Sequence, residues 1–185
     1  MKNNTNNGSY IELGNILDIS EKLNNLKDID SLLDRILFEA RKFSNSDAGS
    51  IFLAHQNHLH FSYVQNDTLA KQKNSNKYIY TDISISINEQ SISGYVAKTG
   101  KLLNIPDVHD LPENVPYSFN PSFDRQSSYF TKSALTIPLM TGAGRIVGVM
   151  QLINPLDENG EIHSYTKDEE IFTTFLATNA SSVIE

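Results

Sequence analysis

The sequence of 185 residues contains no cysteine. Disulfide bonds, thiolate metal sites, cysteine nucleophiles and thioether-linked cofactors are therefore excluded. No stretch reaches the roughly 18 consecutive apolar residues that a membrane-spanning helix needs. The first nine residues, MKNNTNNGS, lack the apolar segment of a secretory signal. These absences predict a cytoplasmic protein with no membrane partner.

Positive charge is also scarce. The chain has 15 Lys and Arg against 22 Asp and Glu, a net charge of −7, and no run of basic residues. A nucleic-acid surface needs clustered Lys and Arg, so we expect no nucleic-acid partner. The 39% of hydrophobic residues is typical of a globular domain with a real core.

The N-terminal region predicts a disordered tail over residues 1–9 and a signalling or dimerisation helix within residues 10–28. Apolar residues recur at helical spacing before and after the interruption "NNLKDID", so two helices fit better than one. The second helix, about residues 30–45, can be capped by Asp28 or Asp30. We expect it to open the main domain, residues 29–185.

The middle of the chain alternates between strand and loop patterns. Residues 48–66 predict two strands around a "HQN" turn, residues 67–80 an exposed loop, and residues 83–87, "ISISI", a third strand. A helix of about ten residues then starts near Glu89 and ends at Gly100. Residues 102–108 predict a fourth strand.

A long polar loop follows, and a loop of this length in a compact domain suggests function. Two strong strands, Lys132–Thr141 and Arg145–Asn154, are joined by a "GAG" hairpin turn. Thr166 and Glu169 form a capping box before a last helix that runs to Glu185 without a breaker. We therefore expect this helix to continue into a covalently attached output domain.

This order of elements predicts an α+β fold. A central antiparallel sheet of about six strands would carry the terminal helices on one face. The short helix and the long loop would cover a pocket on the other face.

Candidate chemistry outside the long loop is sparse. His58 and His60 share one face of a strand and His55 is close, but an evident third metal ligand is missing, so an exposed hairpin face is the simpler interpretation and we expect no metal. The sequence presents no catalytic trio, and we expect no enzymatic activity.

The long loop is richer. Its second half offers an acid, several hydroxyls, a ring and a cation within nine residues: Asp124, Ser127, Ser128, Tyr129, Thr131 and Lys132. A small polar ligand with a flat ring needs such a mixture of groups. The alternative is a solvated loop that caps a sheet edge.

Three segments carry a resemblance to a known family. They are "QSISGYVAKTGKLLNIPDV" (residues 90–108), "FDRQSSYFTKSALTIPL" (123–139) and "GRIVGVMQLINP" (144–155). Over about residues 30–185 the chain resembles a GAF domain, of the branch found in cyclic-nucleotide phosphodiesterases and adenylate cyclases. The resemblance implies cyclic AMP or cyclic GMP as a regulatory ligand, with the long loop as its lid. The implied ligand contacts are Ser50, Val64, Gln65, Ile92, Ser93, Asp124, Ser127, Thr131 and Gln151.

The sequence also departs from this family. The signature residues map onto Asn154, Tyr165, Glu169 and Glu170, but the lysine that follows the asparagine is replaced by Pro155. In relatives that lysine helps to hold the lid. Two serines replace the usual Thr-Gly in the lid, and the aromatic-acid pair at the end of the second strand is absent.

The resemblance implies a regulatory small-molecule sensor of a larger bacterial-type signalling protein, homodimeric through its terminal helices. The alternative is a dimerisation scaffold with an empty or vestigial pocket. Enzymatic and bilin-binding relatives need cysteines, which this chain lacks.

Overall fold

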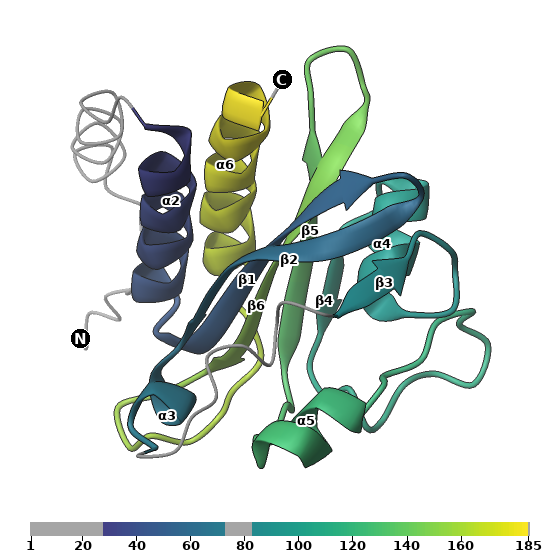
Figure 1. The fold of residues 1–185 in the computed structure, drawn as a ribbon. Helices are drawn as coiled ribbons and strands as arrows, with labels where there is room; N and C mark the ends of the chain where they lie inside the picture. Colours follow the sequence, from purple (N-terminus) through teal and green to yellow (C-terminus); the bar gives the residue numbers. More distant parts are fainter. Residues whose placement is uncertain (1–27, 73–82, 185) are drawn as a thin grey trace, which may run out of the picture.

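The computed structural model describes residues 28–72 and 83–184. The predicted tail and first helix lie outside these residues, apart from Asp28, and so does the second half of the predicted loop 67–80. The described elements follow the expected order (Figure 1): α2 (Ile29–Phe43), β1 (Ser46–His55), β2 (His58–Asn66), α3 (Asp67–Ala70), β3 (Ser84–Ser86), α4 (Ile92–Thr99), β4 (Leu103–Ile105), α5 (Ser122–Ser127), β5 (Ala134–Met140), β6 (Ile146–Pro155) and α6 (Lys167–Ile184).

The six strands form one antiparallel sheet in the order β3-β2-β1-β6-β5-β4. β1 and β6, which lie far apart in the sequence, are neighbours at its centre. The hairpin turn between β1 and β2 places Gln56 and Asn57 at φ 46° and 66°. The predicted α+β fold with a central sheet of six strands is confirmed.

Helices α2 and α6 pack side by side on one face of the sheet (Figure 1). Their buried side chains meet those of the central strands, and Phe43 stacks on Phe172 with ring centroids 4.0 Å apart. The main core lies here, and its members with the lowest exposure include Leu33, Ile36, Leu37, Ile51, Leu135, Met150, Leu152, Phe172 and Leu176. As expected, the helices of the main domain that come from opposite ends of the chain share one face.

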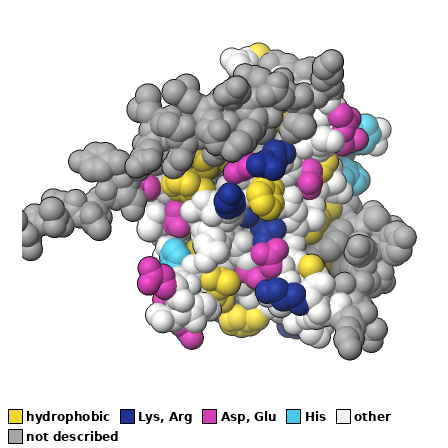
Figure 2. Space-filling view, turned by 90° about the vertical axis from the view of Figure 1, so that its left-hand side faces the viewer, with side chains coloured by type: hydrophobic (Ala, Val, Ile, Leu, Met, Phe, Trp, Pro, Cys, Tyr) yellow, Lys and Arg dark blue, Asp and Glu magenta, His cyan; other side chains and the backbone are white. Residues whose placement is uncertain are grey.

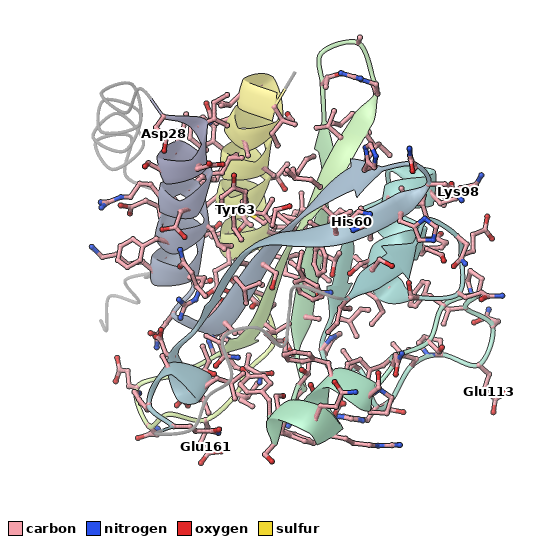
Figure 3. All side chains as sticks on the ribbon, viewed as in Figure 1. Asp28, His60, Tyr63, Lys98, Glu113 and Glu161 are labelled. Carbon is pink, nitrogen blue, oxygen red and sulfur yellow. The ribbon has the colours of Figure 1, made fainter. Side chains whose placement is uncertain are left out.

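The N-terminal end of α2 is capped by Asp28, as the sequence predicted. Its Oδ2 accepts hydrogen bonds from the Ser31 amide (3.0 Å) and hydroxyl (2.8 Å). These bonds to the ionised form hold the pKa of the exposed Asp28 carboxyl below its ordinary value. Tyr63 of β2 lies beside the same helix (Figure 3), and its hydroxyl donates to Asp30 Oδ1 at 2.5 Å.

The outer side of α2 is mixed in character. Figure 2 shows acidic, basic and hydrophobic side chains interspersed on this side of the molecule. Ile29 and Phe38 are exposed, and the guanidinium of Arg35 lies 5.2 Å from the centre of the Phe38 ring. Within the residues that the structure describes, no helix combines the length and apolar character needed to cross a membrane.

Two segments expected to be loop contain short helices. Residues 67–70, predicted as exposed, form α3, because the Asn66 side chain accepts from the Leu69 amide at 2.8 Å and Leu69 is buried. Residues 106–133, the lid, contain α5. Ser128 ends α5 in the left-handed conformation, at φ 55°.

Candidate functional site

A cavity of about 670 Å³ lies on the face of the sheet opposite to α2 and α6. Residues of β1, β2, β5 and β6 line its floor, and residues of β3, the start of α4, and the lid form its walls. Ligand pockets in proteins measure about 300–1,000 Å³, so this cavity has the size of a small-molecule site.

The floor of the cavity includes a row of three side chains on neighbouring strands, which Thr136 continues beyond the lining. Ser50 of β1 pairs in register with Val64 of β2 and Gln151 of β6, and Gln151 pairs with Thr136 of β5. The Gln151 amide donates to Thr136 Oγ1 at 2.9 Å. The antiparallel register thus brings Ser50, Val64 and Gln151 together at the cavity, where all three were expected.

The start of α4 forms one wall. Ser91 caps the helix by accepting from the Gly94 amide at 3.1 Å, and the next two residues, Ile92 and Ser93, line the cavity. Gly94 lets the helix approach β3, since a Cβ there would lie 2.5 Å from the Ser86 carbonyl oxygen. The first turn of a helix favours negative charge through its free amides and its dipole, so this wall suits an anionic or strongly polar group.

The lid contributes Asp124 and Thr131 to the cavity lining. Asp124 Oδ2 accepts from the Thr131 amide at 2.7 Å, and Oδ1 accepts from the Thr131 hydroxyl at 2.9 Å. Both side chains are buried. These two hydrogen bonds close the lid into a compact loop over the sheet.

Asn154 anchors the end of the lid. Its Oδ1 accepts from the amides of Lys132 (2.8 Å) and Ser133 (3.2 Å). Its Nδ2 donates to the Phe130 carbonyl oxygen (2.7 Å) and the Tyr129 hydroxyl (3.1 Å). Asn154 itself has φ 56°, a left-handed conformation that asparagine tolerates better than most residues. This signature asparagine therefore fixes the lid to β6 without lining the cavity.

The other three signature residues lie away from the cavity lining. Tyr165 shares a hydrogen bond of 2.8 Å with Ser46 Oγ, and burial raises the pKa of its hydroxyl well above the ordinary value. Glu169 Oε2 accepts from the Thr166 amide (2.7 Å) and hydroxyl (2.9 Å), which is the predicted capping box. Glu170 pairs with Lys167. These residues support α6 and the start of β1.

Two expected contacts do not line the cavity. Gln65 follows Val64 on β2, so its side chain points to the opposite face, where Nε2 donates to Asp34 Oδ1 at 2.9 Å. Ser127 lies in α5, and its hydroxyl donates to the Phe123 carbonyl oxygen at 2.8 Å. The hydroxyl proton of Ser127 is therefore engaged within α5, because a helical serine can donate to the carbonyl four residues earlier.

Among the described residues that line the cavity, Asp124 is the one with a charged side chain. The lining also offers carboxamides and aromatic rings, namely Asn66, Asn88, Gln90, Asn120, Gln126, Gln151, Phe52, Phe61, Phe119 and Phe123. Carboxamides can both donate and accept, and rings can stack on a flat ligand. The arrangement suits a planar molecule with several hydrogen-bonding edges.

A metal centre is not indicated in the described ranges, 28–72 and 83–184, where no group of three or more His, Asp or Glu side chains is placed to hold an ion. His58 and His60 have ring centroids 6.4 Å apart on the β1–β2 hairpin. His109 lies elsewhere, in the lid, stacked on Phe130 at 5.2 Å.

Asp47 and the contact that Tyr129 makes with it were not predicted from the sequence. The Tyr129 hydroxyl donates to Asp47 Oδ2 at 2.7 Å, and burial, together with this bond, raises the pKa of Tyr129. The two residues are 82 positions apart. No periodicity or local motif connects them, so this contact could be found only from the folded chain.

The sequence of this chain matches the model of a known protein family. The model of the GAF domain family matches residues 28–184. A stretch of 85 residues, 46% of this chain, is 36% identical to the dual 3′,5′-cyclic-AMP and -GMP phosphodiesterase 11 of Drosophila melanogaster. The match covers 5% of that much longer protein.

Solved structures agree on the fold. The GAF domain of an Acinetobacter phosphoenolpyruvate-protein phosphotransferase gives a TM-score of 0.67 at 16% identity, covering 96% of this chain and 94% of that one. The corresponding domain from Coxiella burnetii gives 0.69 at 16% identity, with 91% and 89% covered. A free methionine-R-sulfoxide reductase from Neisseria meningitidis gives 0.63 at 12% identity, with 90% and 83% covered. At such identities the likeness shows the fold alone. Since the family match spans residues 28–184, this chain belongs to the GAF domain family.

Proposed function

We propose that this chain is the ligand-sensing part of a larger signalling protein and that its cavity binds a cyclic nucleotide, cyclic AMP or cyclic GMP. GAF domains act as regulatory sensor modules in signalling proteins. The observation that carries the proposal is the cavity of about 670 Å³ in which the sheet, the start of α4 and the lid meet. Seven of the nine expected contacts line it, all except Gln65 and Ser127.

The chemistry of the lining supports a purine nucleotide. Rings on the lid and the strands can stack on the base, and carboxamides such as Gln151 can pair with its edges. The start of α4, with Ile92 and Ser93, suits the phosphate. The partial sequence match to a dual cyclic-AMP and cyclic-GMP phosphodiesterase points to the same class of ligand.

The work of such a sensor is conformational. A ligand that binds the closed lid better than the open lid shifts the population toward the closed state. The terminal helices α2 and α6 would carry this shift to an attached output domain and, in a homodimer, to the partner. Ligand affinity and output are then coupled in both directions.

The test is thermal unfolding of the full chain with cyclic AMP, with cyclic GMP and without ligand. Ligand at about a hundredfold over its dissociation constant adds roughly 2.7 kcal/mol to the free energy of unfolding. For a domain of this size we expect a rise in Tm of about 5–10 °C. Calorimetry then gives the affinity of any nucleotide that shifts the Tm.

Two variants locate the site. Asp124→Ala should weaken nucleotide binding by more than about 1 kcal/mol, because a buried charge-assisted contact is lost. Gln151→Ala should weaken it as well, whereas Asn179→Ala, which removes a carboxamide of α6 on the opposite face of the sheet, should leave the affinity unchanged. Equal affinities for all three variants would place the ligand outside this cavity.

A second candidate function is a dimerisation scaffold whose cavity takes no ligand. It is favoured by the lid, which closes on internal contacts, since the carboxylate of Asp124 is already engaged by Thr131. Asp124 also carries a negative charge, as does a cyclic nucleotide. An unchanged Tm with both nucleotides, together with a dimer in analytical ultracentrifugation, would favour the scaffold over the sensor.

A further inference from the structure

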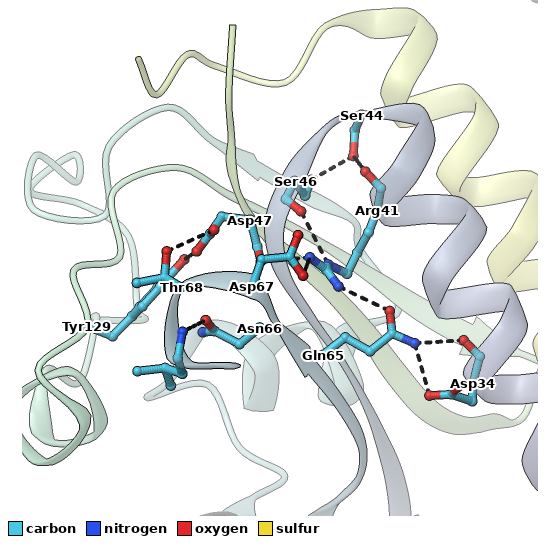
Figure 4. A network of polar contacts seen from close by, with 11 residues as sticks. Asp34, Arg41, Ser44, Ser46, Asp47, Gln65, Asn66, Asp67, Thr68 and Tyr129 are labelled. Atoms are coloured by element: carbon cyan, nitrogen blue, oxygen red, sulfur yellow. Dashed lines mark hydrogen bonds and ion pairs between the residues drawn. The ribbon is translucent and has the colours of Figure 1, made fainter. Parts of the chain in front are cut away.

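A network of polar contacts connects the lid to α2 at one end of the sheet (Figure 4). Its central residues are Asp47 at the start of β1, Arg41 in the last turn of α2, and Tyr129 in the lid. None of the three lines the cavity. Any effect of these three residues on a ligand in that cavity is therefore indirect.

On the lid side, the network ends on the carboxylate of Asp47. The Tyr129 hydroxyl donates to Oδ2 at 2.7 Å, and the Thr68 hydroxyl donates to Oδ1 at 2.9 Å. Asp47 is buried, and a buried carboxylate is costly unless its oxygens are hydrogen-bonded. The closed lid thus supplies one of the donors that this carboxylate needs.

On the helix side, the network ends on the guanidinium of Arg41. Its Nη2 donates to the backbone carbonyl oxygen of Asp47 at 2.8 Å, and its Nε donates to that of Ser46 at 3.2 Å. Its Nη1 donates to Gln65 Oε1 at 3.2 Å, and Gln65 in turn donates to the Asp34 carbonyl oxygen at 2.9 Å. The planar guanidinium holds these acceptors in a fixed geometry, so the start of β1 is tied to α2.

We propose that Asp47 couples the position of the lid to the last turn of α2. The lid holds the side chain of Asp47 through Tyr129, and α2 holds its backbone through Arg41. When the lid opens, the carboxylate must find another donor, and a shift of residues 46–47 disturbs the acceptors of Arg41. A ligand that closes the lid would therefore stabilise the last turn of α2. This last step rests on the proposed function, whereas the coupling itself does not.

The test is amide hydrogen exchange on the full chain without ligand, comparing wild type with Tyr129→Phe. This variant keeps the ring and removes the hydroxyl that donates to Asp47. A hydrogen bond to a charged group is worth a factor of roughly 10 to 150 in an equilibrium constant. We expect exchange at residues 40–45 to rise by at least about threefold, as part of that factor is transmitted to α2.

Tyr63→Phe is the matched control. It also removes a tyrosine–aspartate hydrogen bond, but at the first turn of α2, through Asp30. We expect amide exchange to become faster in the first turn of α2 and to stay unchanged in the lid. The amides of Met150 and Leu152 in the core serve as a reference for global unfolding.

The coupling is also tested from the opposite side. Arg41→Lys, or the milder Gln65→Ala if the first variant does not fold, should speed exchange in the lid at Tyr129 and Thr131, since coupling is reciprocal. Faster exchange confined to the lid in Tyr129→Phe would overturn the proposal. An equal rise at residues 40–45 and in the core reference would overturn it too, because it would indicate a general loss of stability. Absence of nucleotide binding would contradict the proposed function, but it would not affect the exchange test of the coupling between the lid and α2.

Discussion

Leu152 and Gln151 are neighbours on β6, yet they belong to opposite faces of the sheet. Leu152 is fully buried among the apolar side chains of α2 and α6, whereas Gln151 lines the cavity and bonds to Thr136. The same alternation separates Ile51 from Ser50 on β1. The helix face carries the main core, whereas the other face packs smaller clusters against α4 and the lid and leaves room for the cavity beside them.

The largest effect that this comparison predicts is a difference between two alanine variants at adjacent positions. Leu152→Ala should lower the free energy of unfolding by about 2–5 kcal/mol, as it leaves a void in a packed core. Gln151→Ala should cost about 1 kcal/mol or less, the value of one hydrogen bond. Urea unfolding of both variants, with the midpoint and the slope of each transition measured, checks this difference in free energy. Similar losses for the two variants would mean that the cavity face is as tightly packed as the helix face.

A smaller effect is expected at the anchor of the lid. Asn154→Ala removes four hydrogen bonds and places alanine at a positive φ, so we expect a loss of about 2–3 kcal/mol. Asn154→Gly keeps the backbone conformation free of strain and should lose less. Asn179→Ala on α6, where the side chain bonds within its own helix, should change stability by less than about 0.5 kcal/mol. Chemical denaturation of the three variants measures the free energy of unfolding of each. A loss in Asn179→Ala as large as that in Asn154→Ala would contradict this order of effects.

The smallest effect is expected at Asp28, the exposed N-cap of α2. The pKa of Asp28 is lowered by its bonds to Ser31, so its capping contribution is present above the ordinary aspartate pKa and is lost as the pH falls through the lowered value. Protection of the Ser31 amide should therefore decline below about pH 4, with little change in overall stability. An NMR titration of that amide measures the decline. In Asp28→Ser, which caps without a charge, the decline should disappear. An Asp28 that titrates at its ordinary pKa would contradict the structure.

The sequence predicted the strands well because period-two alternation and turn residues are local signals. The family resemblance implied Ser50, Val64 and Gln151 as ligand contacts, and the register brings these three residues side by side. Gln65 does not line the cavity with Val64, because adjacent residues of a strand face opposite ways. Asn66 is a preferred residue type for a helix N-cap, but the four residues of α3 are too few to show helical periodicity, so the sequence did not predict this helix.

The polar network of Asp47, Arg41 and Tyr129 lay beyond prediction for a different reason. Its contacts join the lid, the first strand and the first described helix, and their partners are set by tertiary packing. A buried arginine and a buried aspartate each look like surface residues in the sequence, since both types are mostly exposed. Long-range hydrogen bonds of this kind need the folded chain.

The two outermost strands, β3 and β4, are only three residues long, while the central β1 and β6 have ten each. Unpaired strand edges are the places where one protein chain recruits another into a continuous β-structure, and short edge strands limit this recruitment. The two longest strands, β1 and β6, are paired on both sides. The two longest strands therefore offer no free edge on which another chain could add a strand.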